Sequence, residues 1–270
     1  MSSVLLANDP DRLSVILPAI DADRFRETVA DLGDPALDIG DFDCVVPFTL
    51  DDYGHLRRRP DLHRINCLMP QSALVEILDD KYRCNRLLMA LGFGGNIPAM
   101  DARATSWPII YKKKQDSTGR HSFLCFREAD LRILQASTLP DEYFVQEYIP
   151  GDVEYASHIL AIGGKVIYHS TVKYRFGLAF YVKGEHCPAP PPEFCDCPCY
   201  GQLSAIVERL GYTGTSCFNY KITADGLKLF EINPRFGHSL GFDINRYLTA
   251  YLDALSGAGR DTRSPVSRVA

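Results

Sequence analysis

Short hydrophobic runs separated by polar stretches mark the start of the chain. The run over residues 4–7 stops at the turn sequence Asn8-Asp9-Pro10, and similar runs cover residues 44–47 and 65–69. Such runs, bounded by turn residues, are typical of buried strands. Polar, periodic stretches such as residues 24–32 are expected to form helices between them. Alternating strands and helices predict a parallel sheet covered by helices, so we expect a small α/β lobe over residues 1–75.

The pattern changes twice after this lobe. Apolar residues recur at helical spacing from Leu74 to Leu91, and Gly92 ends the pattern. From Trp107 the chain is β-rich, with turn sequences such as Gly163-Gly164 between the runs, so we expect mainly antiparallel sheets. The predicted strands cover residues 108–111, 143–146, 156–162, 165–169, 217–222 and 227–232.

Two segments lack any such periodicity. Residues 186–198 are rich in proline, which central strands and helix interiors exclude, so we expect a long surface loop. Residues 256–270 are small and polar, which predicts a flexible tail.

Composition excludes some functions. The chain is 46% hydrophobic and 23% charged, as in ordinary globular proteins, and its net charge of −5 argues against binding nucleic acid through phosphate contacts. No secretory signal is visible, nor any run of about 18 apolar residues, so we expect a cytoplasmic protein without a membrane partner. In that compartment the nine cysteines are expected to be reduced thiols.

A group of cysteines near the proline-rich segment suggests zinc. Cys195, Cys197 and Cys199 are spaced as C-x-C-x-C, with Cys187 nearby. Structural zinc sites commonly use C-x₂-C pairs, and no matching second pair is visible. We therefore expect plain loop thiols, with zinc binding as the alternative.

A polar hairpin near the end of the β-rich part carries the most specific chemistry. Because strand residues alternate between faces, Glu231 and Asn233 share one face, and the antiparallel return can bring Asn219 opposite them. Carboxylate and amide oxygens without thiolate or imidazole suit a hard cation such as Mg²⁺. Arg235, just past the strand, could reach phosphates on such a cation. The alternative is a polar sheet edge without ligands.

The segment Glu231-Ile232-Asn233-Pro234-Arg235 resembles the metal-binding signature of ATP-grasp enzymes of the carbamoyl-phosphate synthase and biotin carboxylase type. The resemblance extends over residues 80–255. It implies an α/β (α+β) ATP-grasp fold, in which a small parallel N-terminal lobe precedes a two-part nucleotide-binding grasp with antiparallel sheets. The implied parts are residues 1–75, the grasp over 76–255 with a small lid subdomain at about 100–148, and the tail over 256–270.

The resemblance also assigns site residues, with three departures. Residues 115–122 stand in the place of the family's glycine-rich phosphate loop, but Gly119 is their only glycine, where relatives often carry two or three. Asn219 replaces the usual Glu, Asp or Gln, and Lys113 stands where a proline is often seen. Residues 145–154 resemble the linker between the two halves of the grasp, whose backbone meets the adenine edge. The implied ATP contacts are Lys81, Lys112, Ser117, Thr118, Gly119, Glu147, Tyr148, Ile149 and Glu154; the implied metal ligands are Asn219, Glu231 and Asn233; the implied catalytic residues are Arg235 and Lys112. Cleft residues are also sought among Lys173, Tyr174, Arg175 and His238, for which solvated positions are the alternative.

The activity implied by the resemblance is ATP-dependent ligation. With ATP and Mg²⁺ (or Mn²⁺), such an enzyme activates a small-molecule carboxylate as an acyl phosphate, which an amine or a thiol then attacks. An amino acid is the expected substrate, because the first lobe is short. Two alternatives remain at this point: a kinase-like or carbamoyl-phosphate-like phosphoryl transfer, and a nucleotide-binding regulatory protein without turnover. Whether the chain forms a homodimer also stays open.

Overall fold

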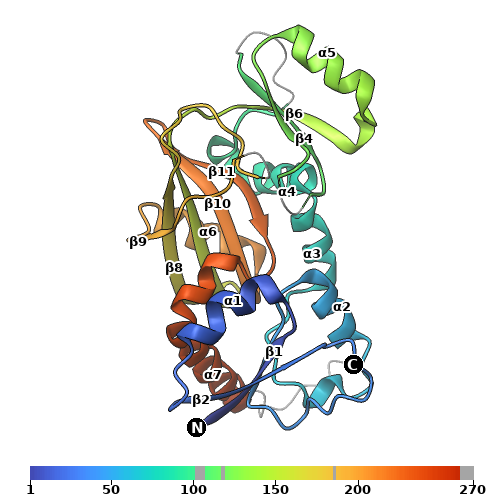
Figure 1. Ribbon diagram of the computed structural model, residues 1–270, viewed down its shortest axis with the longest axis vertical. Helices are drawn as coiled ribbons and strands as arrows, with labels where there is room; N and C mark the ends of the chain where they lie inside the picture. Colours follow the sequence, from blue (N-terminus) through green and yellow to red (C-terminus); the bar gives the residue numbers. More distant parts are fainter. Residues whose placement is uncertain (101–106, 117–118, 185–186, 262–270) are drawn as a thin grey trace, which may run out of the picture.

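Three sheets follow one another along the long axis of the molecule (Figure 1). The computed structural model describes residues 1–100, 107–116, 119–184 and 187–261. The sheets are β2-β1-β3 near the N-terminus, β5-β4-β6 at the opposite end and the five-stranded sheet β11-β10-β7-β8-β9 between them. This mixture of one parallel and two antiparallel sheets confirms the predicted fold class.

The N-terminal sheet is parallel, but its strands differ from those expected. Residues 24–32, predicted as a helix, contain the strand β2, whose Phe25, Thr28 and Val29 are β-formers paired along β1. Residues 65–69, predicted as a strand, join no ladder; Val45 N–H donates to the Asn66 carbonyl at 2.9 Å. The elements here are β1 (Ser2–Ala7), α1 (Pro10–Ala19), β2 (Phe25–Ala30), β3 (Cys44–Val46), α2 (Leu50–Arg57) and a 3₁₀ turn (Leu62–Arg64).

The helical stretch after this lobe is divided by Asp80. Its carboxylate accepts the Arg83 N–H at 2.9 Å and so caps a new helix, because Asp satisfies an unpaired N–H of the first turn. Gly92, at φ +95°, ends the stretch as predicted. The elements are α3 (Ser72–Asp79), α4 (Lys81–Leu88), a π turn (Met89–Phe93) and a 3₁₀ turn (Gly94–Asn96). The break places Lys81 on the first residue of α4.

The small antiparallel sheet lies at the far end of the molecule (Figure 1). One helix packs beside it over a core of Ile109, Tyr111 and Cys125, and Tyr111 stacks on Tyr143 with ring centres 4.8 Å apart. The elements are β4 (Ile109–Lys113), β5 (Ser122–Cys125), α5 (Glu128–Ser137), a 3₁₀ turn (Pro140–Glu142) and β6 (Tyr143–Glu147).

The large sheet contains the strands predicted over residues 156–162, 165–169, 217–222 and 227–232. One correction concerns the proline-rich segment, in which Glu193–Cys195 forms the short edge strand β9 against β8. These three residues contain no proline, and an edge strand needs hydrogen bonds on one side only. The neighbouring prolines therefore do not disrupt the pairing with β8. The elements are β7 (Val153–Ile162), β8 (Lys165–Arg175), β9, α6 (Tyr200–Leu210), β10 (Gly214–Thr223) and β11 (Gly226–Asn233).

The last helix returns to the N-terminal sheet. After a 3₁₀ turn (His238–Asp243), α7 (Ile244–Asp261) packs Tyr247, Leu248 and Tyr251 into one core with β1 and β3. The two ends of the chain therefore stabilise each other. The helix continues to Asp261, into the segment predicted as a flexible tail.

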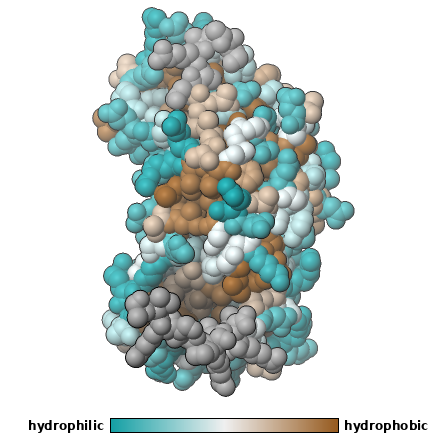
Figure 2. Space-filling view, turned by 180° about the vertical axis from the view of Figure 1, so that it is seen from behind, coloured by the Kyte–Doolittle hydropathy of each residue, from teal (hydrophilic) through white to brown (hydrophobic). Residues whose placement is uncertain are grey.

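The surface of the molecule carries both hydrophobic and hydrophilic side chains. Seen from behind, hydrophobic side chains gather at mid-height of the molecule and hydrophilic ones dominate its upper end (Figure 2). Among the described residues, no helix is both long and apolar enough to cross a membrane.

The contact between α7 and the first lobe yields a stability prediction. The buried Tyr251 hydroxyl accepts the Leu68 N–H at 2.7 Å and lies 3.4 Å from the Val45 carbonyl. Tyr251→Phe leaves that N–H without its partner, so we expect a loss of about 1–3 kcal/mol in unfolding free energy. Urea unfolding measures it. Tyr200→Phe, at a side chain 40% exposed, is the control; equal stability of both variants would contradict this role.

Candidate active site

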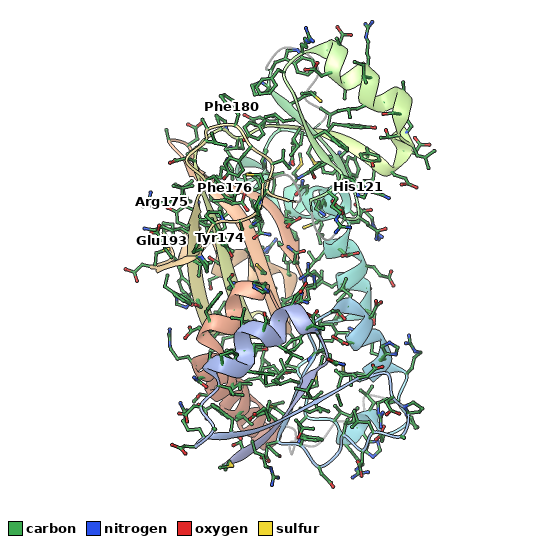
Figure 3. All side chains as sticks on the ribbon, viewed as in Figure 1. His121, Tyr174, Arg175, Phe176, Phe180 and Glu193 are labelled. Carbon is green, nitrogen blue, oxygen red and sulfur yellow. The ribbon has the colours of Figure 1, made fainter. Side chains whose placement is uncertain are left out.

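A cavity of about 370 Å³ opens between the large sheet, the small sheet and the start of α4. Its walls come from distant parts of the chain, so it exists only when the three parts are folded together. Figure 3 shows Tyr174 and Phe176 beside the upper part of the large sheet, with Phe180 nearer the small sheet and His121 on the side of α4. The lining includes Lys81, Lys112, Gly119, Glu147, Tyr148, Ile149, Glu154, Asn219, Glu231, Asn233 and Arg235.

Strand register sets the order of the side chains on the sheet face. Glu231 lies opposite Asn219, as the sequence predicted, and Asn219 lies opposite Ala156 on β7. The next row on the same face, two residues along each strand and about 7 Å away, contains Asn233, Cys217 and His158. The face therefore presents two parallel polar rows to the cavity.

The centre of the site is the Glu231 carboxylate. Its Oε1 accepts the side-chain N–H groups of Asn219 at 2.7 Å and Asn233 at 2.9 Å, and its Oε2 lies 3.4 Å from Lys81 Nζ. Burial by itself raises the pKa of Glu231, but Lys81, the two amides and Lys112 outweigh it and lower the pKa to about 2. The carboxylate is therefore ionised at neutral pH.

Lys112 joins this centre through an irregularity of the hairpin. The register of β11 shifts between Glu231 and Leu229, so Phe230 has no partner on β10. Its carbonyl lies 3.4 Å from Lys112 Nζ. Burial lowers the pKa of Lys112 to about 8, against the opposing effect of Glu231. The ammonium is thus held at the cavity wall in a state that titrates near neutrality.

Lys81 has two partners. Besides its ion pair with Glu231, its Nζ donates to the carbonyl of Asp116, a residue of the segment expected to form the phosphate loop. Lys81 therefore connects α4, β11 and that segment. Arg235 lines the same end of the cavity and lies 3.5 Å from the Phe236 carbonyl.

The donor set suits a hard cation. Asn219 and Asn233 use their amide nitrogens on Glu231, so their oxygens can face a cation beside its ionised carboxylate, although the Asn219 oxygen also accepts the Cys217 thiol at 3.8 Å. Mg²⁺ characteristically takes one or two carboxylates and completes its shell with water and substrate phosphates. The residues therefore fit Mg²⁺, provided that phosphates supply further negative charge.

The linker between β6 and β7 forms the other end of the cavity. Lys221 Nζ, on β10, donates to the carbonyls of Ile149 at 3.0 Å and Gly151 at 2.8 Å, and it lies 4.3 Å from the centre of the Tyr181 ring. Burial lowers the pKa of Lys221 to about 8, opposed by Glu154 and Asp152. This contact fixes the linker expected to meet the adenine.

Tyr148 and Glu147 are also engaged within the protein. The Tyr148 hydroxyl donates to the Tyr181 carbonyl at 2.8 Å and accepts the Tyr181 N–H. Glu147 lines the cavity, but its Oε2 accepts the Ala99 N–H at 2.9 Å. Its carboxylate is thus already used on one oxygen, which the sequence did not indicate.

Glu154 pairs with a lysine that the sequence did not suggest. Lys183 Nζ donates to the Glu154 carboxylate, and both side chains line the cavity. Burial alone lowers the pKa of Lys183, but Glu154 outweighs it and raises that pKa. A Cβ on Gly119 would lie 2.4 Å from the Lys183 carbonyl, so glycine permits the phosphate-loop segment to touch the segment after β8.

The structure brings most of the predicted residues to one cavity. Ser117 and Thr118 lie outside the described residues. Tyr174 and His238 line the cavity, whereas Lys173 and Arg175 each lie 3.3 Å from Glu193 on the edge strand. The lining residues missed from the sequence include Lys221, Lys183, His158, Tyr181 and Ser239. Only Lys221 had a usable signal, because it follows Asn219 by two residues on the same strand face.

The cysteine group lies on the far face of the large sheet. Cys197 Sγ lies 3.6 Å from both the Ser157 and Tyr220 hydroxyl oxygens. A hydrogen bond from Cys199 lowers the pKa of Cys197 to about 5. Among the residues with described positions, no set of three or more His, Cys, Asp and Glu side chains is placed to hold a metal.

Comparison with known proteins identifies the fold. No protein-family model and no curated protein matches the sequence. Among solved structures, the chain is similar to D-alanine–D-alanine ligase from Bacillus anthracis, with 12% identity, TM-score 0.64, and coverage of 97% of this chain and 99% of the ligase. It is also similar to an L-amino acid ligase from Bacillus licheniformis, with 16% identity, TM-score 0.56, and coverage of 94% of this chain and 74% of the other.

A third similar structure is the biotin carboxylase domain of a 2-oxoglutarate carboxylase from Hydrogenobacter thermophilus, in complex with MgADP, ADP and bicarbonate. Its identity is 15% and its TM-score 0.59, over 95% of this chain and 70% of that domain. All three proteins have the ATP-grasp fold. The chain therefore has the ATP-grasp fold, which confirms the resemblance found in the sequence.

The titration of Lys112 predicts a pH dependence of nucleotide binding. A phosphate beside the ammonium favours its protonated form, so binding raises the Lys112 pKa above the free value of about 8. Affinity for ATP should be full below that value and fall as the pH rises through it, by about tenfold for each unit of pKa difference between the bound and free protein. Isothermal titration between about pH 7 and pH 10 measures it.

The control for this prediction is Lys112→Arg, which stays charged over that range. Its ATP affinity should be nearly constant. A slope as steep as that of the wild-type protein would assign the titration to another group, such as Lys221.

Proposed function

We propose that this protein is an ATP-dependent ligase that joins a carboxylate to an amine through an acyl phosphate. One observation carries the proposal: the Glu231 carboxylate, the amides of Asn219 and Asn233 and three cationic side chains (Lys81, Lys112 and Arg235) lie together on the wall of the cavity of an ATP-grasp fold. Such a set suits a metal–triphosphate complex. Phosphoryl transfer needs no protein nucleophile, since it depends on positioning and charge neutralisation.

Each residue has a proposed role. Lys81, Lys112 and Arg235 neutralise phosphate charge, and Arg235 and Lys112 act during transfer of the γ-phosphoryl group. Asn219, Glu231 and Asn233 would hold Mg²⁺ (or Mn²⁺), which supplies charge neutralisation between the phosphates. The adenosine would lie along Glu147, Tyr148, Ile149 and Glu154, and the segment with Ser117, Thr118 and Gly119 would cover the phosphates.

The compared structures support a proposal about the substrates. Two of them are ligases of amino acids, and another D-alanine–D-alanine ligase structure from Bacillus anthracis is a complex with ATP. Together with the modest cavity, this supports a small carboxylate such as an amino acid as the acceptor of the phosphoryl group, and a small amine as the nucleophile. The proposal includes the division of the chain into a first lobe that ends at residue 75, a grasp domain that ends at residue 255 and a tail. It also includes the formation of a homodimer.

A paired screen tests the reaction. Amino acids and other small acids are offered in pairs with amines, with ATP and Mg²⁺, and ADP is measured. ADP formation that requires both an acid and an amine supports ligation. A stable phosphorylated product formed without the amine would favour a kinase-like reaction, and ATP binding without ADP formation would favour a regulatory protein.

The variant that tests the proposed metal site most directly is Glu231→Gln. Glutamine has nearly the same shape as glutamate but lacks the charge that Lys81 and the metal would require, so the rate of ADP formation should fall by about 10²–10³. Turnover at raised Mg²⁺ and thermal unfolding are measured together. The variant should fold and retain part of its ATP affinity through Lys112 and the linker.

Glu208→Gln, at an exposed position on α6, is the matched control and should behave as wild type. Full activity of a stable Glu231→Gln protein would remove Glu231 from the proposed metal site. An unfolded one would show that its role is structural.

A further inference from the structure

Two side chains of the cavity, Tyr181 and His158, have a buried polar atom without a hydrogen-bond partner among the described residues, and His158 lies on the face of the large sheet. His158 is 1% exposed, and its Nε2 lies 2.8 Å from Ser239 Oγ. Its Nδ1 has no hydrogen-bond partner among the described residues, although the ring lines the cavity. A buried polar atom without a partner is costly in free energy. In the wall of a cavity, such an atom is a candidate to meet a partner that arrives with a ligand.

The position of His158 along the sheet face shows which part of a ligand it would meet. Lys221 fixes the linker at one end, and Asn219 with Glu231 forms the next row. His158 lies in the row beyond, about 7 Å further from the linker. A nucleotide with its base at the linker and its phosphates at Glu231 would therefore present the reacting phosphoryl group, and the acid that receives it, toward His158.

The His158 ring packs directly against Gly237. A Cβ at this position would lie 2.5 Å from His158 Cε1 and 2.8 Å from its Nδ1. The backbone of Gly237, at φ −88° and ψ 143°, is one that any residue adopts, so conformation does not require glycine here. The missing side chain instead allows the ring to take this position at the cavity wall.

The charges around His158 show which ligand group lacks a partner. The anionic groups of the proposed reaction are met by Lys81, Lys112 and Arg235. The nearby carboxylates of Glu231 and Glu154 are already paired with lysines. An amine, which brings N–H donors, needs an acceptor at this end. Burial, together with Lys183 and His238, lowers the pKa of His158 to about 3, so the imidazole is neutral and one of its nitrogens is an acceptor.

We infer that His158 Nδ1 accepts a hydrogen bond from the attacking amine of the second substrate and so orients it, while Ser239 positions the ring. This inference rests on the proposed ligase function. It requires the ring proton on Nε2, which then donates to Ser239 Oγ. His158 is thus a specificity residue for an amine-bearing nucleophile.

The tautomer can be tested without substrate. Nitrogen-15 NMR of histidine-labelled protein distinguishes a protonated from an unprotonated ring nitrogen, and the spectrum of His158→Asn assigns the signal. We expect an unprotonated Nδ1 and a protonated Nε2. A proton on Nδ1 would overturn the inference, since the free nitrogen would then suit a carbonyl or carboxylate of the substrate.

The catalytic test separates the two half-reactions. In His158→Gln the amide reaches the Nε2 position and can keep Ser239, but no polar atom remains at Nδ1; His158→Asn does the reverse. Acyl phosphate is trapped as a hydroxamate with hydroxylamine, and ligation is followed with the acid–amine pair that the screen identifies. We expect ligation by His158→Gln to fall by about 10², as when a reacting group is misplaced, and at least tenfold more than hydroxamate formation. His158→Asn should recover part of this loss.

The outcomes are distinct. Equal losses of ligation and hydroxamate formation in a folded His158→Gln protein, or no loss, would reject the role of His158 while the ligase function stands. If the wild-type protein forms neither ADP nor hydroxamate with any acid, the proposed function itself fails.

Discussion

The site depends on one partly buried carboxylate surrounded by groups that would otherwise repel one another or remain unpaired. Glu231 faces Lys81 and Lys112, and it accepts both asparagine amides on one oxygen. Without its charge, two buried ammonium groups would lie close together in a medium that screens them poorly. The carboxylate therefore makes it possible to store positive charge in the cavity until a phosphate arrives.

The same carboxylate connects parts of the chain that are distant in sequence. Through Lys81 it joins the start of α4 to β11, and Lys81 extends the connection to Asp116. Lys112 reaches the same strand through the Phe230 carbonyl, which the hairpin irregularity leaves outside the ladder of β10. The small sheet and the large sheet are thus held against each other by the groups proposed to bind phosphate. In the proposed function, nucleotide binding would consequently be coupled to the arrangement of these two sheets.

The sequence predicted those features that depend on neighbours along the chain. Alternation along β11 placed Glu231 and Asn233 correctly on one face. A regular hairpin would put Asn219 opposite Phe230, and the register shift between Asn219 and Tyr220 is what brings Asn219 opposite Glu231. The prediction failed for residues 24–32, where polar spacing suggested a helix but pairing with β1 forms an edge strand. Lys183 and His158 gave no signal, because their roles arise from contacts with Glu154 and Ser239, 29 and 81 residues away. Such long-range pairs become visible only in three dimensions.

The charges around position 219 explain why an asparagine suits a place where the family usually has Glu, Asp or Gln. A second carboxylate opposite Glu231 would neutralise more of the charge of Lys81 and Lys112, and two carboxylates this close would resist ionising together. The neutral amide of Asn219 instead donates to Glu231 at 2.7 Å and lowers the pKa of that carboxylate, so one charge is held firmly rather than two weakly. At the end proposed to bind phosphate, the cavity keeps an excess of positive charge. That excess would favour a ligand which brings several negative charges of its own, and it would make binding of the proposed metal depend on the phosphates rather than on the protein alone.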